Sequence, residues 1–288
     1  MSVYDIVTEK ILAQLEAGVL PWRQPWTSSN PKNLVSKREY QGINVLLLSL
    51  RGYASPWWVT LNQANYLGGK VKRGEKGSMI VFYRMIENKK RRKANGDPET
   101  FPLFTSWTVF NLEQTEGLNA PESNKDPVLS IEAAEELSNK YRANSGPGLG
   151  VSDHAAYVPS TDTVVMPPRD SFANADLYYS TLFHEYGHST GHPSRLNRVL
   201  EVAKMLPSEN YSKEELIAEL SAAFTCGRLG ITRSQEASAS YLQGWIKTLR
   251  GDSRLIVSAA SAAEKATRYI FGEREGVAAP EVSEEVTA

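Results

Sequence analysis

Cysteine is almost absent from this sequence, since Cys226 is the only one among 288 residues. A single cysteine excludes an intramolecular disulfide framework and a zinc ribbon made of several cysteines, and it fits a reducing cytoplasm. Long apolar runs are also missing, because no stretch approaches the roughly 20 apolar residues of a membrane-spanning helix. The first five residues lack the basic start and apolar core of a signal peptide. We therefore expect a globular cytoplasmic protein that has no contact with a membrane.

Net charge is nearly absent as well, but the total of −1 conceals two unlike halves. Residues 1–120 contain 16 Lys and Arg against 10 Asp and Glu, a net charge of +6, whereas residues 121–288 contain 16 against 23, a net charge of −7. Five of the six tryptophans lie in the basic half. A basic half rich in aromatic residues indicates nucleic-acid binding, and its charge argues against a DNA mimic covered with carboxylates.

Histidine is the third scarce residue type, and three of the four histidines lie within residues 184–192. His184 and His188 are four positions apart, so a helix places both imidazoles on one face, where they can bind one metal ion. Glu185 lies next to His184 and can reach a metal-bound water without binding the metal itself. The sequence HEYGH is therefore the HExxH motif of metallopeptidases, with Glu185 as the predicted catalytic base.

A catalytic zinc ion usually has three protein ligands and one open position for water. The metzincin pattern would require histidine at the position of Ser194, so this class is excluded. His192 lies four residues after His188, but a straight helix separates it from His184 by about 12 Å along the axis, unless the helix breaks at Gly191. The third ligand is therefore expected further along the chain.

Residues 214–224 are typical of a helix that Ser212 opens as its N-cap. Two glutamates on one face of this helix, Glu215 and Glu219, are candidates for the third ligand. We expect Glu219 to bind the metal, because its neighbours are small or apolar and an unpaired carboxylate among them would be costly. Glu215 is the alternative, or it orients one of the histidine rings. Both could instead be surface charges of an amphipathic helix.

The basic half offers two kinds of residue for binding nucleic acid. The glycine-rich loop at residues 68–77 contains four cations that could neutralise phosphates: Lys70, Lys72, Arg73 and Lys76. Five aromatic residues could stack on bases, which suits single strands of any sequence: Trp22, Trp26, Tyr40, Trp57 and Trp58. Tryptophans are also common in cores, and charged loops are often only solvated. The loop does not match the P-loop pattern, so nucleotide hydrolysis is not supported.

The apolar pattern predicts an α+β protein of two domains, joined by a proline-containing linker at residues 121–128. In the first domain, residues 1–120, we expect helices at 3–17 and 41–50, strands at 78–84 and 106–110, and a flexible hairpin tip at 87–100. In the second domain, residues 129–271, we expect strands at 155–159 and 163–167 and helices at 130–141, 215–227, 234–249 and 255–271. Residues 272–288 are polar and acidic, and we expect them to be disordered.

Several segments resemble the ArdC family of plasmid antirestriction proteins: residues 40–48, 156–167, 178–192 with Arg195 and Leu196, and 214–219. The resemblance extends over nearly the whole chain and includes both histidines and the glutamate of the motif. It implies an N-terminal domain that binds single-stranded DNA and a C-terminal zincin-like metallopeptidase domain akin to the SprT and Spartan proteases. It also implies protection of incoming conjugative plasmid DNA from restriction in the recipient cell.

These observations together predict a zinc site, with another divalent ion such as manganese as the alternative. The expected partners are single-stranded DNA and, if the site cleaves peptides, a protein substrate such as a restriction enzyme or a DNA-bound protein. A non-proteolytic alternative stays open, because a peptidase fold does not establish a peptidase. In that alternative the protein coats or escorts single-stranded DNA, and its metal is structural or vestigial.

Overall fold

The computed structural model describes residues 2–23, 30–92, 98–121, 131–198, 209–234 and 239–273. The predicted linker at 121–128 and the predicted tail at 272–288 lie almost entirely outside the described residues, and so does Trp26. Within the described ranges, none of the helices is both long and apolar enough to cross a membrane.

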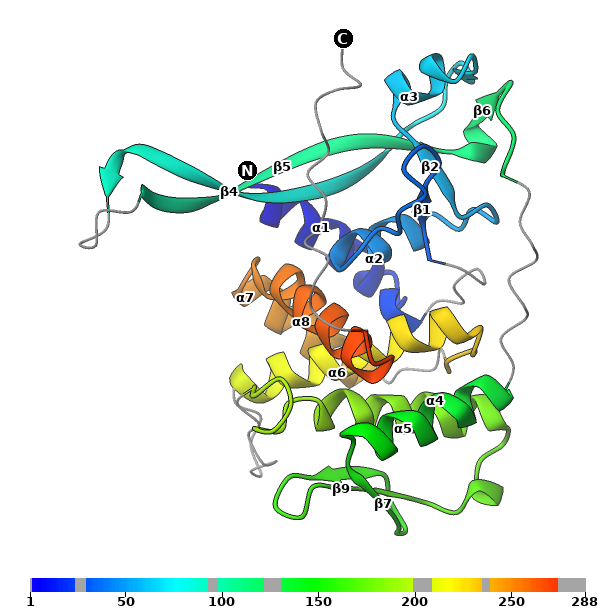
Figure 1. Ribbon diagram of the computed structural model, residues 1–288, viewed down its shortest axis with the longest axis vertical. Coiled ribbons are helices and arrows are strands. Elements are labelled where there is room, and N and C mark those ends of the chain that lie inside the picture. Colours follow the sequence, from blue (N-terminus) through cyan, green and yellow to red (C-terminus); the bar gives the residue numbers. More distant parts are fainter. Residues whose placement is uncertain are drawn as a thin grey trace.

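The N-terminal region is built on a four-stranded sheet in the order β1-β2-β5-β4, with a separate short pair β3-β6. The strands are β1 (Lys32–Asn33), β2 (Trp57–Val59), β3 (Lys70–Val71), β4 (Ser78–Arg92), β5 (Pro98–Asn111) and β6 (Thr115–Glu116). The antiparallel hairpin of β4 and β5 extends beyond the helices on one side of the molecule (Figure 1). Most of residues 87–100 is therefore strand, and the expectation of a long hairpin tip there was wrong, because cross-strand pairing continues from Ser78 to Arg92.

Three helices accompany this sheet, α1 (Val3–Glu16), α2 (Ile43–Ser49) and α3 (Leu61–Tyr66). The Ser2 side chain accepts a hydrogen bond from the Asp5 amide and the Asp5 carboxylate accepts one from the Ser2 amide, so a capping box opens α1. Asn44 of α2 binds the edge of β4, since its side-chain amide donates to Val81 O (2.8 Å) and its Oδ1 accepts from Val81 N (2.7 Å). The Asn44 contacts fix α2 against the sheet.

In the described part of the C-terminal region there are five α-helices and a small sheet in the order β7-β9-β8. The helices are α4 (Ile131–Asn144), α5 (Ala175–Ser189), α6 (Glu209–Leu229), α7 (Ala239–Gly251) and α8 (Leu255–Ile270). The strands are β7 (Gly148–Val151), β8 (Ala156–Val158) and β9 (Thr163–Met166), and β8 lies at an edge of this sheet. The predicted helices and the β8–β9 hairpin are confirmed, but Ser212 lies inside α6 and is not its N-cap.

The two regions share one hydrophobic core. Buried residues of α1 and α2 pack in a single cluster with those of α6, α7 and α8. In Figure 1 the helices α6 and α8 lie between the long β4–β5 hairpin and the small sheet of the C-terminal region. Trp22 illustrates the sharing, because its side chain is 0% exposed and contacts Trp245 of α7 edge-on at 5.6 Å between ring centroids. The architecture is the expected two-domain α+β fold, with the domains joined by a continuous core.

Candidate metal centre

The sequence of α5 explains how the motif residues reach the interior. Asn174 caps the helix by accepting a hydrogen bond from Leu177 N (2.9 Å). Four other side chains of α5 are buried in a second hydrophobic cluster, distinct from the one shared by the two regions: Tyr179, Leu182, Phe183 and Tyr186. At Gly187, a Cβ atom would lie 2.3 Å from Ser221 Oγ and 3.0 Å from Ala218 Cα, both on α6. Glycine is therefore required in the motif so that α5 and α6 can pack closely.

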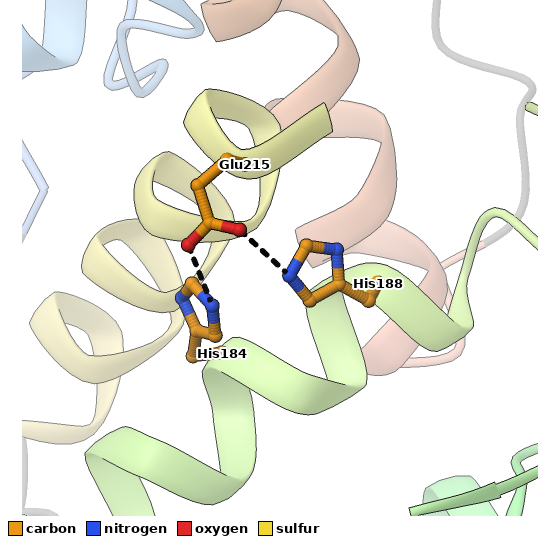
Figure 2. Close-up of side chains that lie close together, drawn as sticks. All are labelled: His184, His188 and Glu215. Atoms are coloured by element: carbon orange, nitrogen blue, oxygen red, sulfur yellow. Dashed lines mark ion pairs between the residues drawn. The ribbon is translucent and has the colours of Figure 1, made fainter. Parts of the chain in front are cut away.

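Close packing of α5 and α6 brings two histidines and one glutamate together (Figure 2). His184 Nε2 lies 3.2 Å from Glu215 Oε1, and His188 Nε2 lies 3.4 Å from Glu215 Oε2. One possible ligand atom from each residue lies within 4.8 Å of the other two. Two imidazole nitrogens and a carboxylate oxygen form a donor set that suits a catalytic divalent ion such as zinc. The three side chains are partly exposed, so an ion could reach them from the solvent.

Glu219, which we expected as the third ligand, lies one turn beyond Glu215 and is engaged elsewhere. Its Oε1 accepts hydrogen bonds from Arg23 Nη2 (2.7 Å) and the Tyr241 hydroxyl (2.6 Å), and its Oε2 accepts one from Arg233 Nη2 (2.7 Å). The side chain is buried, and burial raises its pKa, but Arg233, His184 and Arg23 together hold that pKa well below the usual range. The buried carboxylate does need a partner, as the sequence indicated, but the structure supplies two arginines and leaves Glu215 beside the histidines.

The charges of the ligand cluster are matched in the absence of metal. Burial alone lowers the pKa of His188, but the neighbouring carboxylates of Glu214 and Glu215 outweigh this effect and raise it to about 10. Burial in turn raises the pKa of Glu215, whereas His184 and His188 lower it far below its ordinary value. The cluster is therefore held by ion pairs in which a proton on His188 occupies the place that a divalent cation could take.

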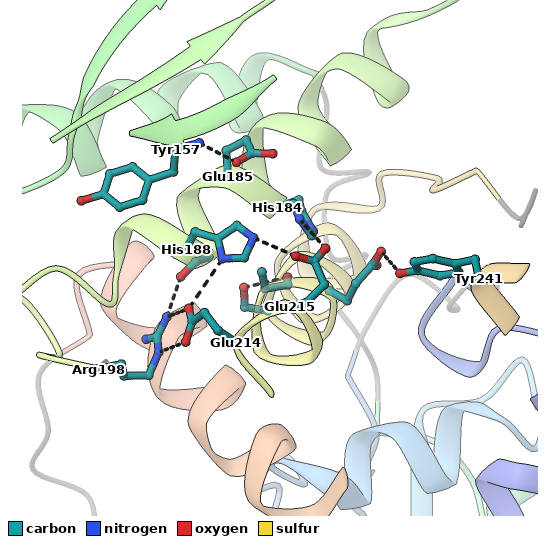
Figure 3. A network of polar contacts seen from close by, with 12 residues as sticks. Tyr157, His184, Glu185, His188, Arg198, Glu214, Glu215 and Tyr241 are labelled. Atoms are coloured by element: carbon teal, nitrogen blue, oxygen red, sulfur yellow. Dashed lines mark hydrogen bonds and ion pairs between the residues drawn. The ribbon is translucent and has the colours of Figure 1, made fainter. Parts of the chain in front are cut away.

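Glu185 lies outside the ligand cluster. Its buried side chain accepts a hydrogen bond at Oε2 from the backbone amide of Tyr157 on the edge strand β8 (2.8 Å), which Figure 3 shows. The neighbouring position on α5 and this bond direct the carboxylate toward the sheet rather than toward Glu215. The third histidine of the segment, His192, lies beyond the end of α5, where its Nδ1 pairs with Ser194 Oγ at 2.7 Å. It is not part of the cluster that the described residues form.

Sequence reasoning missed the residues that hold the β8–β9 hairpin against α5. Arg195 donates to Ser189 O (2.6 Å), to Ser145 O (2.9 Å) and to the carboxylate of Asp162 in the hairpin turn. It also donates to the Tyr157 hydroxyl (3.2 Å). This arginine therefore fixes the strand whose amide holds Glu185. No spacing rule could have assigned this role, because its partners lie in three separate segments: the end of α5, the residue after α4 and the β8–β9 hairpin.

Of the aromatic residues proposed for DNA, two are in the core. Trp22 is 0% and Trp58 is 2% exposed, so stacking on a base would require both to leave the interior, and this expectation is corrected. Trp57 is half-buried with Lys37 Nζ 5.1 Å from its ring centroid, and Tyr40 is half-buried with its hydroxyl accepting from Asn33 Nδ2 at 3.4 Å. Among the residues whose burial is described, the large exposed aromatic residues are instead Tyr66 (73%) and Trp107 (47%).

The four cations proposed for DNA are all exposed. Lys70 forms an ion pair with Glu116 (3.2 Å), and Lys72 Nζ donates to Glu113 O (2.7 Å). The side chains of Arg73 and Lys76 have no counter-charge among the residues that the structure describes. Tyr66 ends α3 only four residues before Lys70, so an exposed aromatic ring and exposed cations occur together in this part of the chain.

Comparisons with known proteins match the N-terminal and C-terminal regions of the chain to two different family models. A family described as zincin-like metallopeptidase matches residues 132–262, and the N-terminal domain of the anti-restriction factor ArdC matches residues 1–110. The crystal structure of the antirestriction protein ArdC from plasmid R388, in its metal-free form, is 38% identical with a TM-score of 0.77 and covers 95% of this chain and 98% of that one. Its Mn(II)-bound structure is 36% identical with a TM-score of 0.76 and the same coverage.

Relatives known from sequence include one longer protein and one of similar length. DNA primase TraC of Escherichia coli is 37% identical over 290 residues, which cover 93% of this chain but only 27% of TraC. The chain thus spans about a quarter of that relative. Protein y4eC of Sinorhizobium fredii (strain NBRC 101917 / NGR234) is 32% identical, with 95% of this chain and 92% of y4eC covered.

Proposed function

This chain belongs to the family of ArdC antirestriction proteins, and we propose that it protects incoming conjugative plasmid DNA from restriction in the recipient cytoplasm. In this proposal the N-terminal region binds single-stranded DNA. The C-terminal region carries a divalent-metal centre of the metallopeptidase type. The convergence of His184 Nε2, His188 Nε2 and the Glu215 carboxylate within hydrogen-bonding distance is the observation that carries the proposal.

The proposed ligands are His184, His188 and Glu215, with zinc as the preferred ion and manganese as the alternative. The Mn(II)-bound structure of the ArdC relative supports a divalent ion at this kind of centre. When bound, such an ion supplies Lewis acidity to a carbonyl group and lowers the pKa of a water molecule. Two histidines and a glutamate leave a coordination position open for that chemistry.

Glu185 is the proposed general base. The Tyr157 amide occupies its Oε2, which leaves Oε1 to accept a proton from the attacking water and to pass it to the leaving amine. This hydrogen bond holds the base beside the edge strand β8, to which Tyr157 belongs. Arg195 supports the same strand through Asp162 and the Tyr157 hydroxyl.

For the single strand of DNA we propose the surface formed by Tyr66 and the basic loop, with Lys70, Lys72, Arg73 and Lys76 contacting phosphates. Tyr66 would stack on a base, which the buried Trp22 and Trp58 cannot do without unfolding. Figure 1 shows α3 and α5 on opposite sides of the shared helical layer, so this surface and the metal centre are well separated. DNA could therefore bind whether or not a peptide bond is cleaved.

That separation keeps a second function open, in which the protein coats or escorts single-stranded DNA and its metal has no catalytic role. A conjugative transfer assay into a restricting recipient separates the two functions when wild type is compared with Glu185→Ala. Removal of a general base typically slows bond cleavage by about 10² to 10⁴, while the ligands and the basic loop stay in place. Glu136→Ala, which changes an exposed glutamate of α4, is the matched control.

If Glu185→Ala loses protection while it still binds metal and DNA, proteolysis is the protective act. If Glu185→Ala protects transferred DNA as well as wild type and Glu136→Ala do, the metallopeptidase function is rejected and coating of the strand becomes the better account.

A further inference from the structure

The ring of His188 has a carboxylate at each nitrogen. Nε2 lies 3.4 Å from Glu215 Oε2, and Nδ1 lies 3.6 Å from Glu214 Oε1. Glu214 and Glu215 are successive residues of α6, about 100° apart around the helix, so their carboxylates approach the ring from different directions. A histidine that binds a metal through one nitrogen normally donates its other N–H to an acceptor, which fixes the ring and its tautomer. Glu214 is placed to be that acceptor.

Glu214 is buried and is itself held by an arginine (Figure 3). Arg198 donates to it through two bonds, Nη2 to Oε1 (2.7 Å) and Nε to Oε2 (3.0 Å). Such a two-pronged pair fixes direction as well as charge. Burial raises the pKa of Glu214, but His188 and Arg198 lower it further than burial raises it, so the carboxylate stays ionised at neutral pH.

Arg198 also binds the last turn of α5, which carries His188. Its Nη2 donates to Gly187 O (2.8 Å) and its Nη1 donates to Thr190 Oγ1 (2.9 Å). The arginine therefore connects the helix that supplies both histidines with the helix that supplies Glu215. We propose that Glu214 and Arg198 are positioning residues of the metal centre, which hold His188 with Nδ1–H toward Glu214 and Nε2 toward the ion.

This inference rests on the proposed metal centre and goes beyond its three ligands. The alternative is that Glu214 and Arg198 form only a structural ion pair between α5 and α6. The two roles differ in one measurable respect. A structural pair stabilises the protein equally with and without metal, whereas positioning residues increase the additional stability that metal confers.

The experiment is a zinc titration of the full chain against a competing chelator, together with thermal unfolding with and without zinc. Glu214→Ala should weaken zinc binding by about 10- to 100-fold, the usual effect of removing a partner of a metal-bound histidine. Arg198→Gln should act in the same direction. If Glu214→Ala does not fold, Glu214→Gln keeps the side-chain volume and removes the charge. Glu264→Gln is the matched control, because Glu264 is equally buried and faces Arg228 (3.7 Å) away from the cluster.

A double variant, Glu214→Leu with Arg198→Leu, sharpens the test. Replacing both charges of a buried pair with apolar groups often restores stability, so the metal-free double variant should unfold at a higher temperature than Glu214→Ala. Its zinc binding should stay weak, because no acceptor remains at His188 Nδ1. Recovery of zinc binding together with stability would overturn the inference.

Other outcomes identify which proposal fails. If His188→Ala loses zinc and folded Glu214 variants bind it as tightly as wild type, the positioning role alone is overturned. If wild type binds neither zinc nor manganese, the metal centre is overturned and the positioning role with it. Glu264→Gln should lose stability to the same extent with and without zinc.

Discussion

The metal centre and the basic loop at residues 68–77 hold their charges in opposite ways. His184, His188 and Glu215 are largely shielded from water, and each meets a partner within 3.4 Å. The cations of the loop are exposed, and Arg73 and Lys76 have no counter-charge among the described residues. In our proposal the first arrangement selects one small cation by its geometry. The second is proposed to bind any strand of phosphates, with a strength that depends on salt.

Glu219 connects the two regions physically. It lies on α6 one turn after Glu215, and Arg23 reaches it from the N-terminal region. Arg233 contacts both sides of this junction, since its Nη1 donates to Trp22 O (3.2 Å) and its Nη2 to Glu219 Oε2. Regions that differ in their chemistry are thus held together by a buried ion cluster and a shared core. Changes at this junction should affect folding before they affect either kind of binding.

Substitution of Glu219 should produce the largest effect. Glu219→Gln removes the buried carboxylate that pairs with both Arg23 and Arg233, so we expect the free energy of unfolding to fall by about 3–5 kcal/mol. Urea denaturation of the metal-free protein measures it. The control is Glu16→Gln, whose partner Arg250 is exposed and whose loss should cost less than about 1 kcal/mol. An equal loss in both variants would contradict a structural role for the Glu219 cluster.

The second prediction concerns the salt dependence of DNA binding by the basic loop. If all four cations of the loop contact phosphates, the logarithm of the affinity for single-stranded DNA should fall with a slope of about −3 against the logarithm of salt concentration. Affinity would then fall about 50-fold between 50 and 200 mM salt, as fluorescence anisotropy with a labelled oligothymidine can show. Changing Arg73 and Lys76 together to Gln should halve the slope. An unchanged slope would place the phosphate contacts elsewhere.

Two aromatic substitutions should sharpen the contrast between exposed and buried rings. Tyr66→Ala should weaken binding of single-stranded DNA by about 1–2 kcal/mol, or about 5- to 30-fold, through the loss of one stacked base. Its thermal stability should stay close to that of wild type. Trp22→Phe should show the opposite behaviour, with lower stability and unchanged DNA affinity, because Trp22 packs against Trp245 in the core. Equal DNA affinities in wild type and Tyr66→Ala would remove Tyr66 from the proposed surface.

The last prediction concerns pH. The pKa of metal-free His188 is raised from 6.5 to about 10, so its paired imidazolium stabilises the metal-free protein fully below pH 6.5 and loses this contribution as pH rises through 10. A metal ion needs the neutral ring and must displace that proton. Apparent zinc affinity should therefore rise about tenfold per pH unit between pH 7 and 9. Calorimetry in two buffers of different ionisation enthalpy should detect one released proton, and a flat profile would show that His188 is already neutral.

The sequence predicted some of these features because they depend on local spacing. His184, Glu185 and His188 occupy one helix, so a four-residue interval was sufficient to place both imidazoles together. The β8–β9 hairpin was predictable for the same reason, since its two strands alternate around a short turn.

Long-range contacts explain what the sequence could not predict. Glu215 and Glu219 share a helix face, and the choice between them depends on Arg23, which is 196 positions from Glu219 in the chain. Composition likewise showed that tryptophans lie in the basic half, but not how deeply each one is buried. Trp22 is buried in the cluster where α1 packs against α7 and α8. Arg198 carries no motif, so its contact with Glu214 required the packing of α5 on α6 to be known.

The metal content of two glutamate variants tests the central claim most directly. Wild type, Glu215→Gln and Glu219→Gln would be purified without chelator, confirmed as folded by circular dichroism, and analysed for zinc and manganese by mass spectrometry. Our account predicts about one divalent ion per chain in wild type and in Glu219→Gln, and little or none in Glu215→Gln. Full occupancy in Glu215→Gln with loss in Glu219→Gln would contradict it and return the third ligand to Glu219.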